Sequence, residues 1–140
     1  MIINNFVIKG LSHKECDNVA IAETLRHISS KNHALVLVKS YNRLHELERE
    51  YDTYIHEQNI KDAFKIREVD HRLDIVCKSS GSRISIRVVG SGGWLKLKPK
   101  QGCFTSVWLS LDDAGYFETS SLVEKYLSDC IRCKVPIITY

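Results

Sequence analysis

Apolar residues recur along the chain at two spacings, and these predict an alternation of strands and helices. In the first part of the chain, a short apolar strand over residues 6–8 precedes a helix over residues 12–30 that starts with a serine–glutamate capping box. Residues 34–38, ALVLV, are apolar throughout, which is typical of a strand buried on both faces of a parallel sheet. A second helix is expected over residues 41–58, with Ser40 as its N-cap.

The second helix has the clearest division into an apolar and a charged side. Its apolar side is formed by Leu44, Leu47, Tyr51 and Ile55. The opposite side is formed mostly by Arg43, Glu46, Arg49 and Glu50. This pattern predicts a helix that packs through one side and leaves its charged side to solvent.

After that helix the spacing changes to two, which is the period of a strand. Residues 73–77 and 83–88 alternate in this way around the turn SSGS, and they predict an antiparallel hairpin. The glycine-rich GSGG that follows is expected to be a flexible loop, and residues 94–98 another strand. Residues 107–111 predict a mostly apolar strand, a capping box at Ser121 opens the last helix, and PIITY is expected as a closing strand.

The order of these elements predicts an α/β domain with three layers. Strands that alternate with helices favour a mainly parallel sheet with helices on both faces, and the hairpin is then an antiparallel insertion. The chain has 140 residues, which is the size of one domain and enough to bury a hydrophobic core. We therefore expect a single domain over residues 1–140.

Composition narrows the class of protein further. No apolar run approaches the roughly 20 residues that span a bilayer, and the first residues lack the features of a secretory signal. Five scattered cysteines, an odd number, favour free thiols over a disulfide framework. We therefore expect a cytoplasmic protein that has no membrane partner.

A surface for nucleic acid would have to be local, because the net charge is only +3. Basic residues gather in the hairpin and the segment after it, with one tryptophan among them: Arg83, Arg87, Trp94, Lys96, Lys98 and Lys100. Such residues can follow a phosphate backbone while the indole stacks on a base. The alternative is that alternating basic residues form one solvated face of the sheet.

Two segments carry candidate chemistry at the carboxyl ends of predicted strands, where open α/β sheets bind ligands. Residues 10–16 read GLSHKEC, and Asp112-Asp113 end the segment VWLSLDD. With the buried strand and helix of ALVLVKSYNRLHELEREY between them, these segments resemble the ATPase core of large terminases, the motors that package viral DNA. They resemble helicase cores more loosely. The resemblance covers most of the chain.

The resemblance implies roles for the two segments. Gly10, His13 and Lys14 stand where the family binds nucleotide. Asp112 stands where the family holds Mg²⁺, and Asp113 stands where it activates water. ATP and Mg²⁺ are the cofactors that the resemblance implies, and the setting it implies is a host cytoplasm.

The phosphate-binding segment departs from the family pattern at several points. A working loop, GxxxxGK[ST], needs glycines so that backbone N–H groups can wrap phosphates, and a hydroxyl to hold Mg²⁺. Here the loop is short, His13 replaces the glycine before the lysine, and Glu15 occupies the hydroxyl position. The alternatives are a solvated Lys14 and aspartates that cap a turn at Asp112-Asp113.

A second candidate chemistry is zinc binding. His13-x-x-Cys16 and Cys130-x-x-Cys133 have the spacing of zinc ligands. The alternative is that Cys130, which falls on the apolar side of the last helix, is buried as a small hydrophobic residue.

Three functions therefore follow as hypotheses. The first is a non-hydrolysing ATPase-like module that binds DNA or a motor protein, as an accessory or inhibitor in viral DNA packaging or DNA metabolism. The second is an ATPase that is active alone or completed by a partner. The third is a regulatory protein stabilised by zinc. The sequence does not predict an oligomeric state.

Overall fold

The computed structural model describes residues 4–5, 13–69, 72–91, 104–109 and 121–140, and the side chains of all of these except 4–5, 13–16, 91 and 121–122. The described strands form one sheet in the order β1-β7-β6-β2-β5-β4-β3. Their bounds are β1 Asn4–Asn5, β2 Ala34–Val38, β3 Phe64–Val69, β4 Arg72–Cys77, β5 Arg83–Val88, β6 Ser106–Leu109 and β7 Ile137–Thr139. The helices are α1 His13–Ser29, α2 Tyr41–Glu57 and α4 Ser121–Arg132, with short 3₁₀ turns at Lys61–Ala63 and Val89–Ser91.

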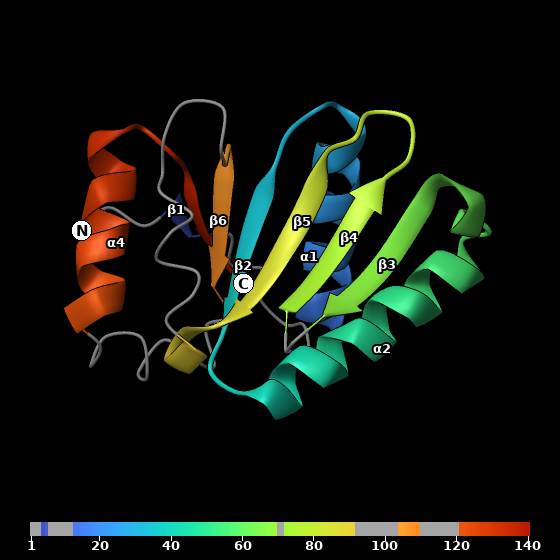
Figure 1. The fold of residues 1–140 in the computed structure, drawn as a ribbon, viewed down its shortest axis with the longest axis horizontal. Helices are drawn as coiled ribbons and strands as arrows, with labels where there is room; N and C mark the ends of the chain where they lie inside the picture. The colour runs from blue at the N-terminus through green and yellow to red at the C-terminus, as the bar shows by residue number, and fades with distance from the viewer. Residues whose placement is uncertain (1–3, 6–12, 70–71, 92–103, 110–120) are drawn as a thin grey trace.

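The sheet is mainly parallel, as the order of elements predicts. β1, β7, β6, β2 and β5 run parallel to one another, whereas β4 is antiparallel to both β5 and β3. The hairpin of β4 and β5 is therefore confirmed, and it lies toward one side of the sheet with β3 at the edge (Figure 1).

Helices cover the two faces of the sheet unequally. The apolar sides of α1 and α2 pack on one face, over β2, β5, β4 and the first part of β3, and this packing forms the larger core. α4 packs on the other face, where Val123, Leu127 and Cys130 meet Leu35, Leu37, Val107 and Leu109. The predicted three-layer α/β architecture is thus confirmed. None of the described helices is both long and apolar enough to cross a membrane.

The elements predicted from spacing agree with the structure at most boundaries. Residues 34–38 form β2 and are buried along their whole length, and Ser40 Oγ accepts a hydrogen bond of 3.2 Å from the backbone N–H of Arg43 as the N-cap of α2. The predicted strands over residues 6–8 and 94–98 lie outside the described residues. Part of the predicted GSGG loop forms the 3₁₀ turn Val89–Ser91 instead.

The edge strand β3 was not predicted. Its sequence FKIREV points Phe64 and Ile66 toward the helices, but the next residue on that side is Glu68. Only two apolar residues therefore mark its buried face, which is too short an alternation to distinguish a strand from a loop.

Each of the three described helices is followed, two residues after its end, by a residue with a left-handed backbone. The φ angles are 65° at Lys31, 55° at Asn59 and 58° at Lys134. The next backbone N–H in each case bonds to a carbonyl five residues back, as in Asn32 to His27 at 3.3 Å and Val135 to Cys130 at 2.8 Å. This is the Schellman form of helix end, in which glycine usually occupies the left-handed position.

Candidate functional site

The nucleotide-site residues predicted from the sequence lie mostly outside the described part of the chain. Gly10, Asp112 and Asp113 are among them and stay predictions. His13 and Lys14 open α1, but their side chains are not described. β7 lies between β1 and β6 and is parallel to both, so the carboxyl ends of these strands share one edge of the sheet.

A buried ion pair joins the N-terminal parts of α1 and α2 near this edge. Nη2 of Arg43 donates to both carboxylate oxygens of Asp17, at 2.8 and 2.9 Å, and Nη1 lies 3.1 Å from Glu46. Arg43 is only 6% exposed and Asp17 1%. Burial lowers the pKa of Arg43, but the hydrogen bond and the negative charge of Asp17 outweigh it and raise that pKa. The guanidinium is therefore always charged.

The expectation that Arg43 lies on the solvent side of its helix is wrong. The residue belongs to the charged stripe in the sequence, but its side chain turns into the space between α1 and α2 because Asp17 supplies a buried partner there. The two residues are 26 positions apart, so spacing within one helix carries no signal of the pair.

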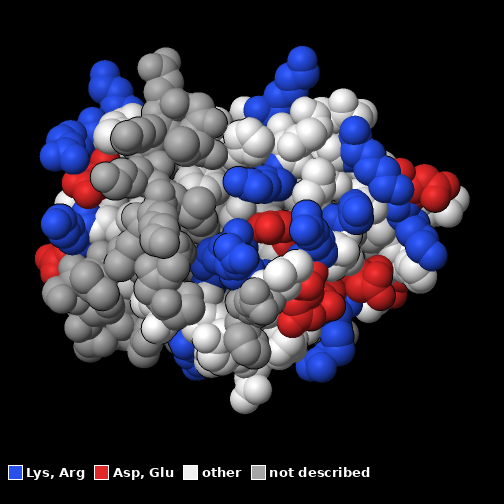
Figure 2. Space-filling view, viewed as in Figure 1, with Lys and Arg blue, Asp and Glu red and all other residues white. Residues whose placement is uncertain are grey.

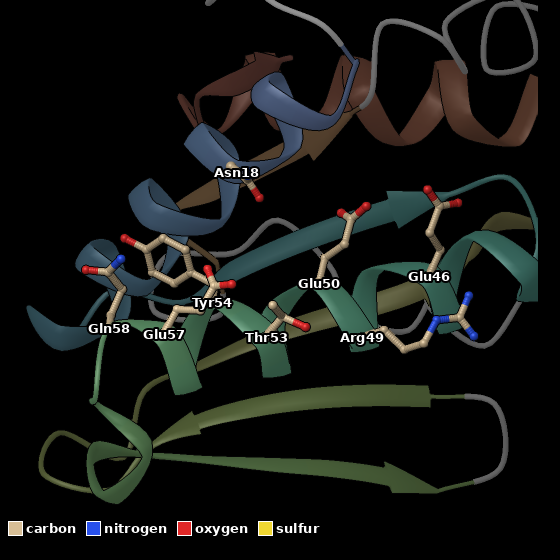
Figure 3. Close-up of a pocket in the computed structure, with 8 residues that line it drawn as sticks. All are labelled: Asn18, Glu46, Arg49, Glu50, Thr53, Tyr54, Glu57 and Gln58. Atoms are coloured by element: carbon tan, nitrogen blue, oxygen red, sulfur yellow. The ribbon is translucent and has the colours of Figure 1, made fainter.

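A groove of about 550 Å³ runs along α2 beside this pair. Figure 3 shows its side chains, which come from α2 and its C-cap Gln58, except for Asn18 on α1. Three of them are glutamates, Glu46, Glu50 and Glu57, and one is Arg49. An excess of carboxylates repels phosphate, so the groove does not suit a nucleotide.

Glu50 is the titratable residue of this groove with the most altered environment. Burial, followed by the negative charge of Asp17, raises the pKa of Glu50 to about 7. Its Oε2 is buried without a hydrogen-bond partner among the described residues. The carboxyl group therefore gains or loses its proton close to neutral pH.

The face of β3, β4 and β5 that points away from α1 and α2 has no described helix over it (Figure 1). We call it the open face. Because side chains alternate along a strand, the residues between those that face the helices belong to it: Lys65, Arg67, Val69, Arg72, Asp74, Val76, Arg83, Ser85 and Arg87. On β5, Ser85 and Arg87 are buried, whereas the members on β3 and β4 are exposed or half-buried. Five are cations and one is an anion. Lys and Arg side chains are visible over these strands in Figure 2.

The exposed cations of the open face have no carboxylate partner among the described residues. They are Lys65, Arg67, Arg72 and Arg83. The single anion, Asp74, is already paired with Arg87 at 3.0 Å. Arg83 was expected from the sequence and the other three were not, although the alternating Lys65 and Arg67 in FKIREV could have indicated two of them.

Arg87, which was expected to contact nucleic acid, is only 6% exposed. Its guanidinium donates to the carbonyl oxygens of Leu73 and Ile86, at 3.1 and 3.0 Å, and to Asp74 at 3.0 Å. In this structure it is not available to phosphate, because the guanidinium is buried and already bonded to these three acceptors. The other expected contacts, Trp94, Lys96, Lys98 and Lys100, lie outside the described residues.

Cys130 of α4 and Cys133, in the turn that follows this helix, are in different environments. Cys130 is fully buried in the core under α4, whereas Cys133 is exposed. Burial raises the pKa of Cys130 to about 12, which opposes the thiolate that zinc requires. Cys130 is thus packed as a small hydrophobic residue. The side chains of His13 and Cys16 are not described.

No family model and no curated protein matches the sequence. Among solved structures, the chain is similar to a mutant of the large terminase ATPase domain of Thermus phage P74-26, with a TM-score of 0.55 and 12% sequence identity. The match covers 90% of this chain and 55% of that one, so the chain spans about half the length of the terminase domain. At this identity the similarity shows the fold alone: the chain has a terminase-like ATPase fold.

Proposed function

We propose that this chain is an ATPase-like module that does not hydrolyse nucleotide and binds the phosphate backbone of DNA through the open face. The observation that carries the proposal is the set of four exposed cations without a carboxylate partner among the described residues, Lys65, Arg67, Arg72 and Arg83. The terminase-like fold supports a setting in DNA packaging or DNA metabolism. There the module acts as an accessory or inhibitor of a motor, in a cytoplasm.

The dimensions of the open face suit a nucleic-acid backbone. Three neighbouring strands are about 10 Å wide, and successive side chains on one face are about 6.6 Å apart. Lys65, Val76 and Arg83 form one row across the strands, and Arg67, Asp74 and Ser85 form the next. The cations are thus spread over all three strands, and Arg87 compensates the charge of Asp74 beneath them.

The chemistry of the open face favours binding without base specificity. Its described residues include no aromatic ring for stacking, and its cations are on long side chains that reach phosphates. Trp94 would add stacking if it lies beside this face, which stays a prediction.

The salt dependence of DNA binding tests the proposal. Four phosphate contacts give a slope of log K against log salt of about −3.6, which is roughly a 100-fold loss of affinity between about 50 and 200 mM salt. In fluorescence anisotropy with a mixed-sequence duplex, the double variant Arg67→Gln/Arg83→Gln should reduce the slope by about 1.8.

The matched control is Arg49→Gln/Lys125→Gln, which removes the same charge from exposed positions on α2 and α4. Its slope should equal that of the parent chain. Equal slopes in both double variants, or no binding by the parent, would contradict the proposal and favour a protein partner.

ATP turnover separates this proposal from an active ATPase. The segment GLSHKEC has a histidine and a glutamate where a phosphate loop needs glycine and a hydroxyl, so we expect no turnover with or without DNA. Turnover that is lost in Lys14→Ala or Asp112→Ala would show that the module hydrolyses nucleotide.

A further inference from the structure

Three potential metal ligands meet where α2 passes the edge strand β3. His45 and Glu48 are three residues apart on α2 and therefore lie on the same side of the helix. Glu68 approaches them from β3. Nδ1 of His45 lies 3.4 Å from Oε1 of Glu68 and 3.7 Å from Oε2 of Glu48, and the three donor atoms all lie within 4.8 Å of one another.

We infer that His45, Glu48 and Glu68 form a binding site for a divalent first-row transition-metal ion, with Zn²⁺ as the best-suited member of that class. Nothing in the proposed DNA contact requires this site, and it lies on the helix side of the sheet, opposite the open face.

The donor separations match the geometry of a tetrahedral ion. Zinc binds imidazole nitrogen at about 2.0–2.1 Å and carboxylate oxygen at about 2.0–2.2 Å, so neighbouring ligand atoms are about 3.4 Å apart. The two distances from His45, 3.4 and 3.7 Å, are close to that value. The side chains are between 30% and 43% exposed, which leaves a fourth position for water.

Charge favours a cation at the same place. Among the described residues, His45 is the sole ion-pair partner of both Glu48 and Glu68. A neutral imidazole does not compensate the negative charge of the two neighbouring carboxylates, whereas a bound divalent ion does. The mixed nitrogen and oxygen donor set favours zinc, nickel or cobalt over Mg²⁺ and Ca²⁺, which prefer oxygen alone.

A second group of carboxylates, contributed by α1 and α2, shows what distinguishes a cation site from an ion-pair network. Asp17, Glu46 and Glu50 are equally close to one another. There, however, the guanidinium of Arg43 already lies 2.8 Å from Asp17 and 3.1 Å from Glu46. An internal cation occupies that group, whereas none of the described lysine or arginine residues pairs with the group around His45.

Titration with Zn²⁺ and with Co²⁺ tests the inference. Calorimetry with Zn²⁺ should give one saturable site, and His45→Ala and Glu68→Gln should each weaken it at least tenfold. The visible spectrum of the Co²⁺ form should show bands of a nitrogen and oxygen site without thiolate charge transfer. Circular dichroism should show that both variants remain folded, because all three side chains are partly exposed.

Two controls locate the ion. His56→Ala removes another exposed histidine from the same helix, and Cys133→Ser removes the exposed thiol; both should bind Zn²⁺ as the parent does. Absence of binding by the parent, unchanged binding by His45→Ala, or loss of binding in Cys133→Ser would overturn the assignment. DNA binding provides an independent readout, so failure here leaves the proposed function untouched.

Discussion

The two halves of the sheet are covered differently. β2 and β6 lie between the helix layers and are buried at every residue. Among the described helices, those that cover β3 and β4 lie on one side alone, and most of the alternate residues of these strands are exposed or half-buried. The covered half therefore contributes stability through apolar packing, while the other half keeps cations at the surface. The same division applies to charged residues, since Arg43 is buried with its partner Asp17, whereas Arg67 is exposed and pairs with no carboxylate in the part of the chain that the structure describes.

The largest effect expected from this comparison follows from breaking the enclosed ion pair. Asp17→Asn leaves the Arg43 guanidinium buried with Glu46 as its main counterion, and should lower the free energy of unfolding by about 3 kcal/mol. Asp129→Asn is the matched control, because Asp129 pairs with Arg132 at the same 2.8 Å on an exposed surface. That control should cost about 0–1 kcal/mol. Urea unfolding measures both, and similar losses would refute the distinction between enclosed and exposed charge.

A smaller loss of stability is expected when a buried valine is shortened, and its size should differ between the two halves of the sheet. Val107→Ala in the fully buried β6 removes two methyl groups and leaves a cavity, which should cost about 2 kcal/mol. The same substitution at the half-buried Val76 of the open face should cost less than about 1 kcal/mol. Equal shifts in the denaturation midpoints would mean that the open face is covered in solution.

The smallest effect is a change of stability with pH at Glu50. Its pKa rises from 4.5 to about 7 on folding, so the folded state binds more protons within this window. The contribution of Glu50 to stability is therefore fully present below about pH 4.5 and is lost as the pH rises to about 7. Glu50→Gln should remove that dependence, so its stability relative to the parent should increase between pH 5 and pH 8 by an amount on the order of 1 kcal/mol.

Glu57→Gln is the control for Glu50, since Glu57 lines the same groove but is exposed. Because this variant keeps Glu50, the pH dependence that Glu50 gives to the parent should persist in it. A flat profile for both variants would show that the space between α1 and α2 is open to water.

Local periodicity was sufficient to predict the elements that bury a long apolar stripe. β2 and α2 follow directly from ALVLV and from the spacing of Leu44, Leu47, Tyr51 and Ile55. β3 was not predicted because Glu68 is the third of its residues that face the helices, and Glu68 contacts His45 of α2 rather than the core. Patterns within one element cannot show a contact that another element provides.

The site residues were harder to predict for the same reason. Alternation placed Arg87 on a polar face, but it does not show that Leu73 and Asp74 of β4 provide the acceptors that hold the buried guanidinium. Asp17 and Arg43 come together only because α1 and α2 pack side by side. The nucleotide-site predictions at Gly10, Lys14, Asp112 and Asp113 rest on the resemblance and remain to be tested by ATP binding.

The left-handed helix ends have a consequence for engineering the protein. Lysine at such a position carries a steric penalty that glycine does not, and asparagine tolerates the conformation better than lysine. The left-handed backbone at Lys31 and at Lys134 therefore costs conformational free energy, which the rest of the fold offsets. Replacing each with glycine would recover up to about 1 kcal/mol. Both positions lie outside the open face and the His45 cluster. These substitutions should therefore raise the thermal stability of the chain without altering either proposed binding surface.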